Sequence, residues 1–217
     1  MLKKICIVIA TAFSLLLSFP FVDETRAHPH EWIDIKTELN FNDDGKLASI
    51  RMDWLLDEFS TAYTMESTLG VSNVEISDLA LEKLAATIVG NLEEFSYLTV
   101  FEPDDQVEIK EAIPFKGQMD GIRFNFQFDL IFAEPVDLSG RSLTYAVYDP
   151  LYYIELLHRG EDQAVVLKNA PEACAATIKA PDPAEAQIAY AQSLDRNDQA
   201  EEGLGGFFAE KVEISCQ

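Results

Sequence analysis

Apolar and polar positions alternate near the start of the chain. From Ile33 to Phe41 the apolar residues lie at alternate positions, and mostly charged residues fill the positions between them. This period of two predicts a strand with one buried face. The turn sequence NDDG follows at 42–45, and Leu47 to Trp54 has the pattern of a second strand. These two strands and the turn between them are therefore predicted to form a β-hairpin.

Helical and strand-like patterns then follow one another without a repeat. Asp57 can cap a short helix, Ser77 can cap a longer one with a broad apolar stripe, and a third helix is predicted over 183–195. A polar, glycine-rich loop is predicted over 195–206. Aromatic and branched runs predict strands over 97–101, 107–115, 122–132, 143–157, 164–167 and 207–216. We therefore predict an α+β fold, mostly antiparallel sheet with two or three packed helices, as one domain over 28–217; a division near residue 102 is the alternative.

The first 27 residues have the composition of a secretory signal peptide. Lys3 and Lys4 precede an apolar run over 5–22, and Ala27 is the expected cleavage position. The alternative is an uncleaved membrane anchor, because this run approaches the length of a spanning helix. We expect an exported, periplasmic protein that does not span the membrane after cleavage.

Composition narrows the classes of partner. The 16 Lys and Arg residues face 38 Asp and Glu residues, so the formal net charge is −22. Such a chain repels phosphate backbones, which excludes a nucleic-acid partner, and it favours cationic ones. Aromatic residues make up 11% of the chain and could line a small-molecule pocket.

Two of the three cysteines remain after cleavage, because Cys6 leaves with the signal peptide. Cys174 and Cys216 lack the C-x-x-C spacing of a redox pair, and an exported chain meets an oxidising compartment. We therefore expect a structural disulfide between them.

Cleavage after Ala27 would leave His28-Pro29-His30 at the mature N-terminus, followed by Glu31 and Asp34. Imidazole and carboxylate groups suit Zn(II), Ni(II) or Cu(II). A histidine at the third position can bind Cu(II) together with the terminal amine and a deprotonated backbone amide. Pro29 has no N–H, so this chelate is blocked. Two arrangements stay open: a chelate from the amine and ring of His28, or a tripod of both histidines and one carboxylate. The alternative is a frayed terminus without a ligand.

Other chemistry finds less support. His158 alternates with apolar residues in a strand-like run, which favours a half-buried histidine over a metal ligand. The sequence has no nucleophile motif of the G-x-S-x-G type, and its neighbouring acids are typical of caps and turns. The GLGG sequence at 203–206 stands in the wrong order for a phosphate-binding loop. We therefore expect no enzymatic activity.

Several motifs together resemble one family. They are the HPH sequence at 28–30, the hairpin FNDDGKLASIRMDW at 41–54, the WLLDEFS sequence at 54–60, YDPLYYIEL at 148–156 and the two late cysteines. This combination resembles the domain of unknown function 1007 family of ZevA-like periplasmic zinc-transport accessory proteins. The resemblance implies a partner, an inner-membrane permease of the zinc or nickel/cobalt type.

Asp149 lies inside the last of these motifs and has two interpretations. It can form a structural Asp-Pro turn, or it can be the carboxylate that meets the N-terminal histidines. The function predicted overall is metal binding or delivery for a permease. An interaction module without metal, which assembles with or gates the permease, is the alternative, and a small-molecule binder is a third hypothesis.

Overall fold

A computed structural model describes residues 28–70, 76–103, 107–160, 163–195 and 198–217. The predicted signal peptide, residues 1–27, lies outside this part of the chain. The helical segments are α2 (Glu58–Thr64), η1 (Met65–Leu69), α3 (Asp78–Leu92), η2 (Glu93–Leu98), α4 (Glu185–Ser193) and α5 (Leu204–Phe208). The strands are β1 (Glu31–Phe41), β2 (Leu47–Leu56), β3 (Thr99–Glu102), β4 (Ile109–Asp120), β5 (Arg123–Val136), β6 (Arg141–Val147), β7 (Ile154–His158), β8 (Val165–Lys168), β9 (Cys174–Lys179) and β10 (Lys211–Cys216).

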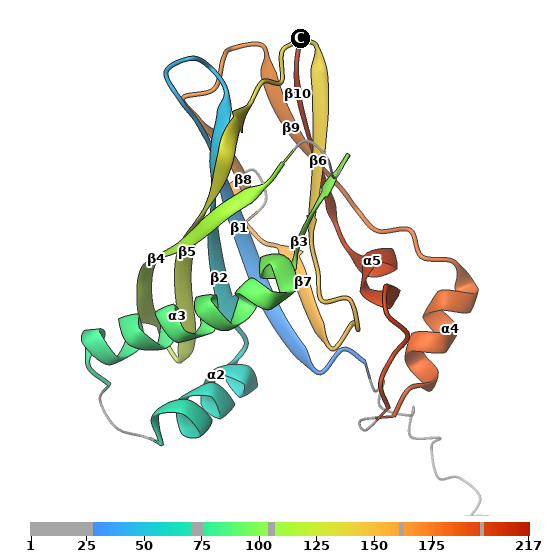
Figure 1. Ribbon diagram of the computed structural model, residues 1–217. Coiled ribbons are helices and arrows are strands. Elements are labelled where there is room, and N and C mark those ends of the chain that lie inside the picture. The colour runs from blue at the N-terminus through green and yellow to red at the C-terminus, as the bar shows by residue number, and fades with distance from the viewer. Residues whose placement is uncertain (1–27, 71–75, 104–106, 161–162, 196–197) are drawn as a thin grey trace, which may run out of the picture.

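The main sheet confirms the predicted α+β class and the opening hairpin. Its strand order is β4-β5-β2-β1-β7, and β8 pairs with β1 farther along the same edge. The β1–β2, β2–β5 and β5–β4 pairs are antiparallel, whereas β7 and β8 run parallel to β1. The sheet is therefore mixed, because the chain makes a long excursion before it returns to the free edge of β1. Two smaller pairs, β3 with β6 and β9 with β10, lie beside it (Figure 1).

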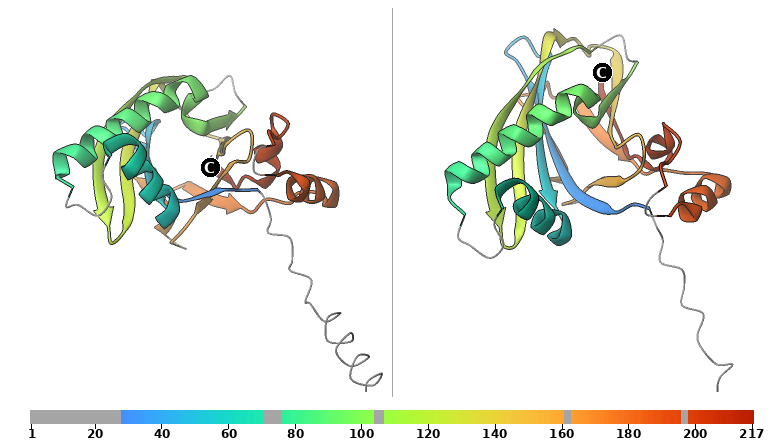
Figure 2. Two further views of the ribbon diagram at one scale, coloured as in Figure 1. Left: turned by 90° about the horizontal axis from the view of Figure 1, so that it is seen from below. Right: turned by 60° about the horizontal axis from the view of Figure 1, so that its bottom comes forward.

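One face of the main sheet forms the core. The alternation within β5 buries its phenylalanines, while the residues between them face outward as polar side chains. Seen from below, the strands curve around this core, and α3 lies along one side of it (Figure 2). The largest core cluster takes side chains from every strand of the main sheet except β4 and β8, and also from α3, β3, β6 and β10. Leu130, Tyr145 and Ile214, from β5, β6 and β10, are examples, and each has no exposed surface.

Helix α3 approaches strand β4 closely at a glycine. Leu81, Leu84 and Ala85 are buried on the face of α3 that packs on the sheet. A Cβ atom added at Gly117 would lie 2.3 Å from the backbone oxygen of Leu81. Only glycine permits this separation between helix and strand, so Gly117 sets how deeply α3 seats on the sheet.

Two local predictions need correction, and one element was missed. The segment predicted as a strand from residue 207 begins as helix α5 and becomes strand β10 only at Lys211. The run over 143–157 is two strands, β6 and β7, separated by a turn. Strand β9 was not predicted, because small residues dominate it and give little apolar alternation. No helix in the described ranges is long and apolar enough to cross a membrane.

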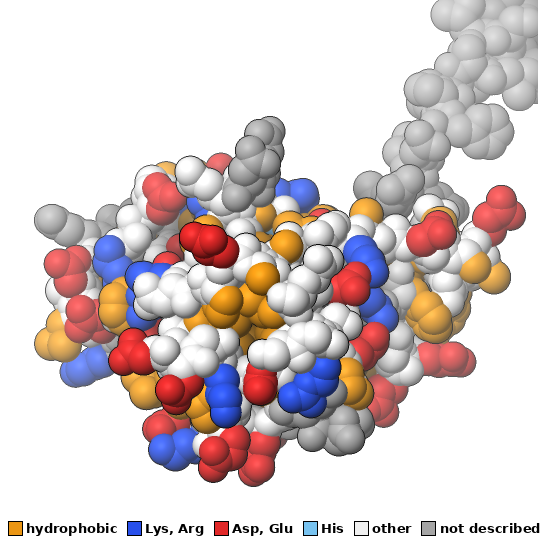
Figure 3. Space-filling model, turned by 90° about the horizontal axis from the view of Figure 1, so that it is seen from above, with side chains coloured by type: hydrophobic (Ala, Val, Ile, Leu, Met, Phe, Trp, Pro, Cys, Tyr) orange, Lys and Arg blue, Asp and Glu red, His pale blue; other side chains and the backbone are white. Residues whose placement is uncertain are grey.

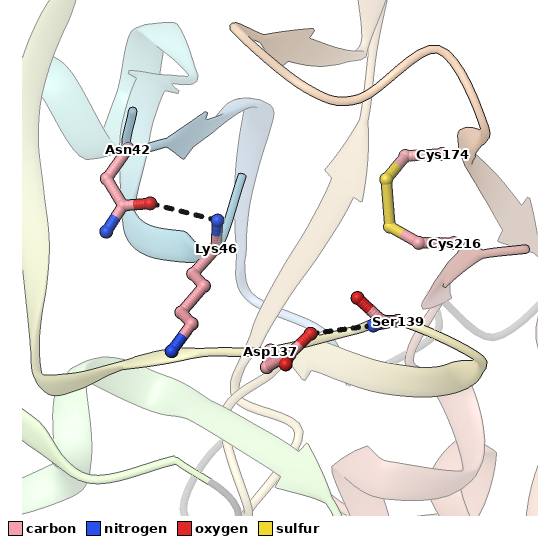
Figure 4. The surroundings of a disulfide bond; sticks show 6 residues. All are labelled: Asn42, Lys46, Asp137, Ser139, Cys174 and Cys216. Atoms are coloured by element: carbon pink, nitrogen blue, oxygen red, sulfur yellow. Dashed lines mark hydrogen bonds between the residues drawn. A yellow bond between two sulfur atoms is a disulfide. The ribbon is translucent and has the colours of Figure 1, made fainter. Parts of the chain in front are cut away.

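The disulfide is present as predicted. Cys174 and Cys216 are paired in register at one end of the β9–β10 ladder and are joined through their sulfur atoms (Figure 4). The backbone N–H of Gly140 also donates to the carbonyl of Cys216, which ties the start of β6 to the same point. The disulfide therefore fixes the C-terminal strand to its neighbours.

The close approach at Gly117 predicts that Gly117→Ala lowers the free energy of unfolding by about 1–3 kcal/mol, because the new methyl group collides with helix backbone. Gly90 lies within α3 with no atom near its missing side chain and is the matched control. Gly90→Ala should raise the free energy of unfolding by about 0.5–1 kcal/mol. Urea denaturation followed by circular dichroism measures both changes. A Gly117→Ala variant as stable as the wild type would contradict the packing described.

The disulfide predicts a loss of two hydrogens in the intact mass of the exported protein under non-reducing conditions. Closing a loop with a sequence separation of 42 contributes about 4 kcal/mol in the chain-entropy model. Chemical reduction and the Cys174→Ser, Cys216→Ser double variant should therefore lower the free energy of unfolding by similar amounts. Free thiols in native material would overturn this prediction.

Candidate functional site

The histidine segment is fixed where β1 meets β7. The backbone N–H groups of His30 and Glu31 donate to the carbonyl of Tyr153 at 2.8 and 3.3 Å. The parallel pairing then begins with Glu31 opposite Ile154. These hydrogen bonds hold His30, just before the start of β1, against the late segment of the chain.

The structure brings His28 and His30 together. Their ring centroids lie 4.7 Å apart, and the ring of Tyr153 lies 4.7 Å from His30 and 6.2 Å from His28. His28 is buried, with 5% of its surface exposed. Its Nδ1 atom is buried and makes no hydrogen bond. An imidazole nitrogen in this state lacks the partner that buried polar atoms normally have.

His28 also lines a cavity of about 240 Å³, which we call the N-terminal pocket. Its other walls come from β1, the turn before β7, α4 and the end of α5. The lining includes Trp32, Tyr152 and Phe208, and Glu155 of β7.

Asp149 organises the turn that supports the histidines. Its carboxylate accepts hydrogen bonds from the backbone N–H groups of Leu151, Tyr153 and Ile154 at 2.7–3.1 Å. These bonds place the Tyr153 carbonyl to which His30 donates. The structural Asp-Pro turn that the sequence predicted is thus observed, and Asp149 acts on the histidine segment through the backbone.

A glycine locks the same turn from the other side. A Cβ atom added at Gly205 would lie 1.9 Å from the carbonyl oxygen of Asp149, and the N–H groups of Gly203 and Gly205 donate to the carbonyl of Pro150. The GLGG sequence therefore packs α5 against the turn.

The predicted carboxylates do not converge on the histidines as metal ligands. In the described part of the chain, no three or more His, Cys, Asp or Glu side chains are grouped so that they could hold one metal ion. Asp34 lies on the outward face of β1, where Arg123 and Arg159 pair with it at 2.9 and 3.2 Å. The structure thus places Asp34 in a polar pocket of about 360 Å³ on the outer face of the sheet.

Glu31 lies close enough to Asp57 and Asp149 for their negative charges to affect its pKa. Burial, and then the negative charges of Asp57 and Asp149, raise the pKa of the Glu31 carboxyl. Three carboxylates therefore give this end of β1 a negative potential, which a bound cation would relieve.

Asp57 was predicted only as a helix cap, and it has a second role. Its carboxylate accepts from the N–H groups of Phe59 and Ser60 at the start of α2, and from the N–H of Trp32 at 3.0 Å. Burial alone would raise the pKa of Asp57, but the hydrogen bonds from Ser60, Trp32 and Phe59 outweigh it and lower the pKa. Asp57 therefore ties α2 to β1 two residues after His30.

His158 is structural, as the sequence favoured. Its side chain is 1% exposed, and its Nδ1 lies 3.0 Å from a carboxylate oxygen of Glu210. Burial alone would raise the pKa of Glu210, but hydrogen bonds from the ring and backbone of His158 outweigh it and lower the pKa. This pair joins β7 to the start of β10.

Three residues around the histidines were not identified from the sequence: Tyr153, Glu155 and Gly205. Tyr153 and Glu155 lie in YDPLYYIEL, a motif in which only Asp149 was proposed as a site residue. Their approach to His28 depends on the parallel pairing of β1 with β7, for which the sequence carries no local signal.

The raised pKa of Glu31 predicts that Glu31→Gln stabilises the metal-free protein at pH 7. A carboxyl with a raised pKa in the folded state destabilises that state once it ionises, so the penalty develops as pH rises above the ordinary value of 4.5. The two proteins should converge in stability below that pH. Urea denaturation at pH 7 and pH 4 with a chelator present tests this, and Glu172→Gln, at an exposed position, is the control. Equal stability of Glu31→Gln and wild type at pH 7 would refute the prediction.

Comparison with known proteins assigns the chain to a family. A family model described as "Protein of unknown function (DUF1007)" matches residues 10–216. A protein of Haemophilus influenzae, named "Uncharacterized protein", is 28% identical over 212 residues, which cover 94% of this chain and 98% of the relative. The match extends through the histidine segment, the YDPLYYIEL motif and both late cysteines, and the chain belongs to the DUF1007 family.

Proposed function

We propose that the protein is an exported, periplasmic accessory protein of a transition-metal transport system of the zinc or nickel/cobalt type. It binds or delivers the metal through His28-Pro29-His30, beside a permease in the inner membrane, and it is not an enzyme. The 4.7 Å separation of the two imidazole rings carries the proposal. Two imidazoles that bind one Zn(II) at about 2.0–2.1 Å in tetrahedral geometry have ring centroids roughly 5 Å apart. The pair therefore needs little rearrangement to bind a metal.

The third ligand is the group that signal cleavage creates. Cleavage after Ala27 gives His28 an α-amine, which can chelate a metal together with its own ring. This source fits the absence, within the described residues, of a third side-chain ligand beside the two histidines. Glu31, Asp57 and Asp149 contribute negative potential without direct coordination. Nitrogen ligands of this kind suit Zn(II), Ni(II) or Cu(II).

The acidic surface supports a cationic cargo in a general way. Acidic side chains, with some Lys and Arg, are also prominent on the top face of the molecule, which is the end opposite the histidine pair (Figure 3). The net charge of −22 raises the concentration of cations near the protein. Specificity comes from the histidine pair.

A second candidate, an interaction module without metal, rests on helix α2. Phe59 and Tyr63 are four residues apart on this helix and are 86% and 69% exposed. Large aromatic side chains at this spacing form one apolar stripe, which is a common way for a helix to dock in a groove. If this role is the main one, Phe59→Ala with Tyr63→Ala abolishes function, whereas loss of both histidines does not.

The metal proposal predicts that His28→Ala and His30→Ala each weaken Zn(II) or Ni(II) binding by about tenfold or more, because each removes one of very few ligands. Titration calorimetry on exported protein with its native N-terminus measures the affinity. Asp34→Asn is the matched control, because the arginine pairs of Asp34 keep it out of this site. Unchanged binding in the double histidine variant would eliminate the site.

The proposed role of the His28 α-amine leads to a separate prediction. One extra residue before His28 keeps both imidazoles but moves the amine, so this protein should bind metal more weakly. Native binding should weaken as pH falls, because a nitrogen must be free of its proton to bind the metal. The same affinity and pH profile in both proteins would reject the amine while leaving the imidazole pair.

A further inference from the structure

The N-terminal pocket has aromatic walls. The ring of Tyr152 stacks on Phe208 with centroids 4.2 Å apart and an angle of 12° between the planes. Trp32 lies on the side of β1 and is 47% exposed. Figure 1 shows α4 and α5 beside the region where β1 begins. Side chains of both helices line the pocket.

One carboxylate supplies the formal charge of the pocket. Glu155 lies opposite Trp32 in the β1–β7 register and accepts a hydrogen bond from the Tyr152 hydroxyl at 3.2 Å. No Lys or Arg is among the described residues that line the cavity. The negative charge of Glu155 therefore faces the pocket without a basic residue in its lining.

A buried hydrogen-bonding atom lies in the same wall. The Nδ1 of His28 is buried without a hydrogen bond, although the residue is only 5% exposed. A neutral imidazole nitrogen can accept one hydrogen bond, and leaving it unpaired in a buried site is costly. The pocket thus combines the carboxylate of Glu155 with aromatic side chains, and the ring of His28 forms part of its wall.

We propose that the N-terminal pocket binds a small molecule with a primary ammonium group on a short apolar chain. The ammonium donates hydrogen bonds to the carboxylate of Glu155, and the aromatic rings attract its charge. The cavity of about 240 Å³ suits a ligand of this size. A quaternary ammonium has no N–H to donate and therefore binds less well, and an anion is repelled by Glu155.

This inference does not rest on the metal proposal, although His28 belongs to both sites. Glu155 belongs only to the pocket, so it separates the two. Glu155→Gln keeps the size of the side chain and removes its charge. It should weaken amine binding and leave zinc binding by the histidine pair unchanged.

The test is calorimetric titration of the exported protein with butylamine, phenethylamine, choline and butyrate. Fluorescence of Trp32 reports on the pocket directly, because the other tryptophan, Trp54, is 1% exposed in the core. We expect both primary amines to bind, choline to bind about tenfold or more weakly, and butyrate not to bind. Glu155→Gln should weaken amine binding about tenfold or more, while the distant Glu172→Gln should have no effect.

The selectivity of the wild type keeps the test independent of any variant that fails to fold. The inference is overturned if neither primary amine binds, if choline and butylamine bind equally, or if a folded Glu155→Gln variant keeps its amine affinity. A Zn(II) titration of the same proteins separates the two proposals. Amine binding without zinc binding leaves this inference standing and rejects the metal function, whereas zinc binding without amine binding does the reverse.

Discussion

The pairing of β1 on both of its edges is the constraint on which the rest of the structure depends. Its antiparallel partner β2 is the other strand of the opening hairpin. Its parallel partners β7 and β8 come from much later in the chain, and each paired residue lies more than 110 positions after its partner in β1. The bonds from His30 and Glu31 to the Tyr153 carbonyl are the first of the contacts between β1 and this late segment. Without this edge, His30 would lose the backbone hydrogen bond that holds it beside Tyr153.

The turn from Asp149 to Tyr153 places the Tyr153 carbonyl and ring beside the histidines. Asp149 holds three backbone N–H groups, and the close approach of Gly205 holds the turn from outside. An aspartate that looks like a ligand thus acts through the backbone. The same turn brings Tyr153 to the histidine rings and leads into Glu155, so the metal candidate and the N-terminal pocket share one support.

Three carboxylates, those of Glu31, Asp57 and Asp149, lie close enough together at this end of β1 to affect one another. Glu31 is held near two other carboxylates at a cost that its raised pKa records, while the hydrogen bonds of Asp57 compensate its own charge. Elsewhere on the sheet the acids are neutralised, as Asp34 is by two arginines. Asp34 is thus paired with basic side chains inside the fold, whereas Glu31 lies beside other acids.

The sequence by itself determined the elements whose pattern is local. The period of two in β1, β2 and β5, the caps at Asp57 and Ser77, and the pairing of the only two late cysteines each follow from residues within a short window or from a simple count. It also singled out His28 and His30 by their position. Only the tertiary structure decided which carboxylates lie near them, because strand order is set by contacts between segments far apart in the chain. That order turned Asp34 toward arginines, made Asp149 a turn residue, and brought Glu155 and α4 to His28, since parallel pairing and helix packing depend on the burial of whole faces rather than on local spacing.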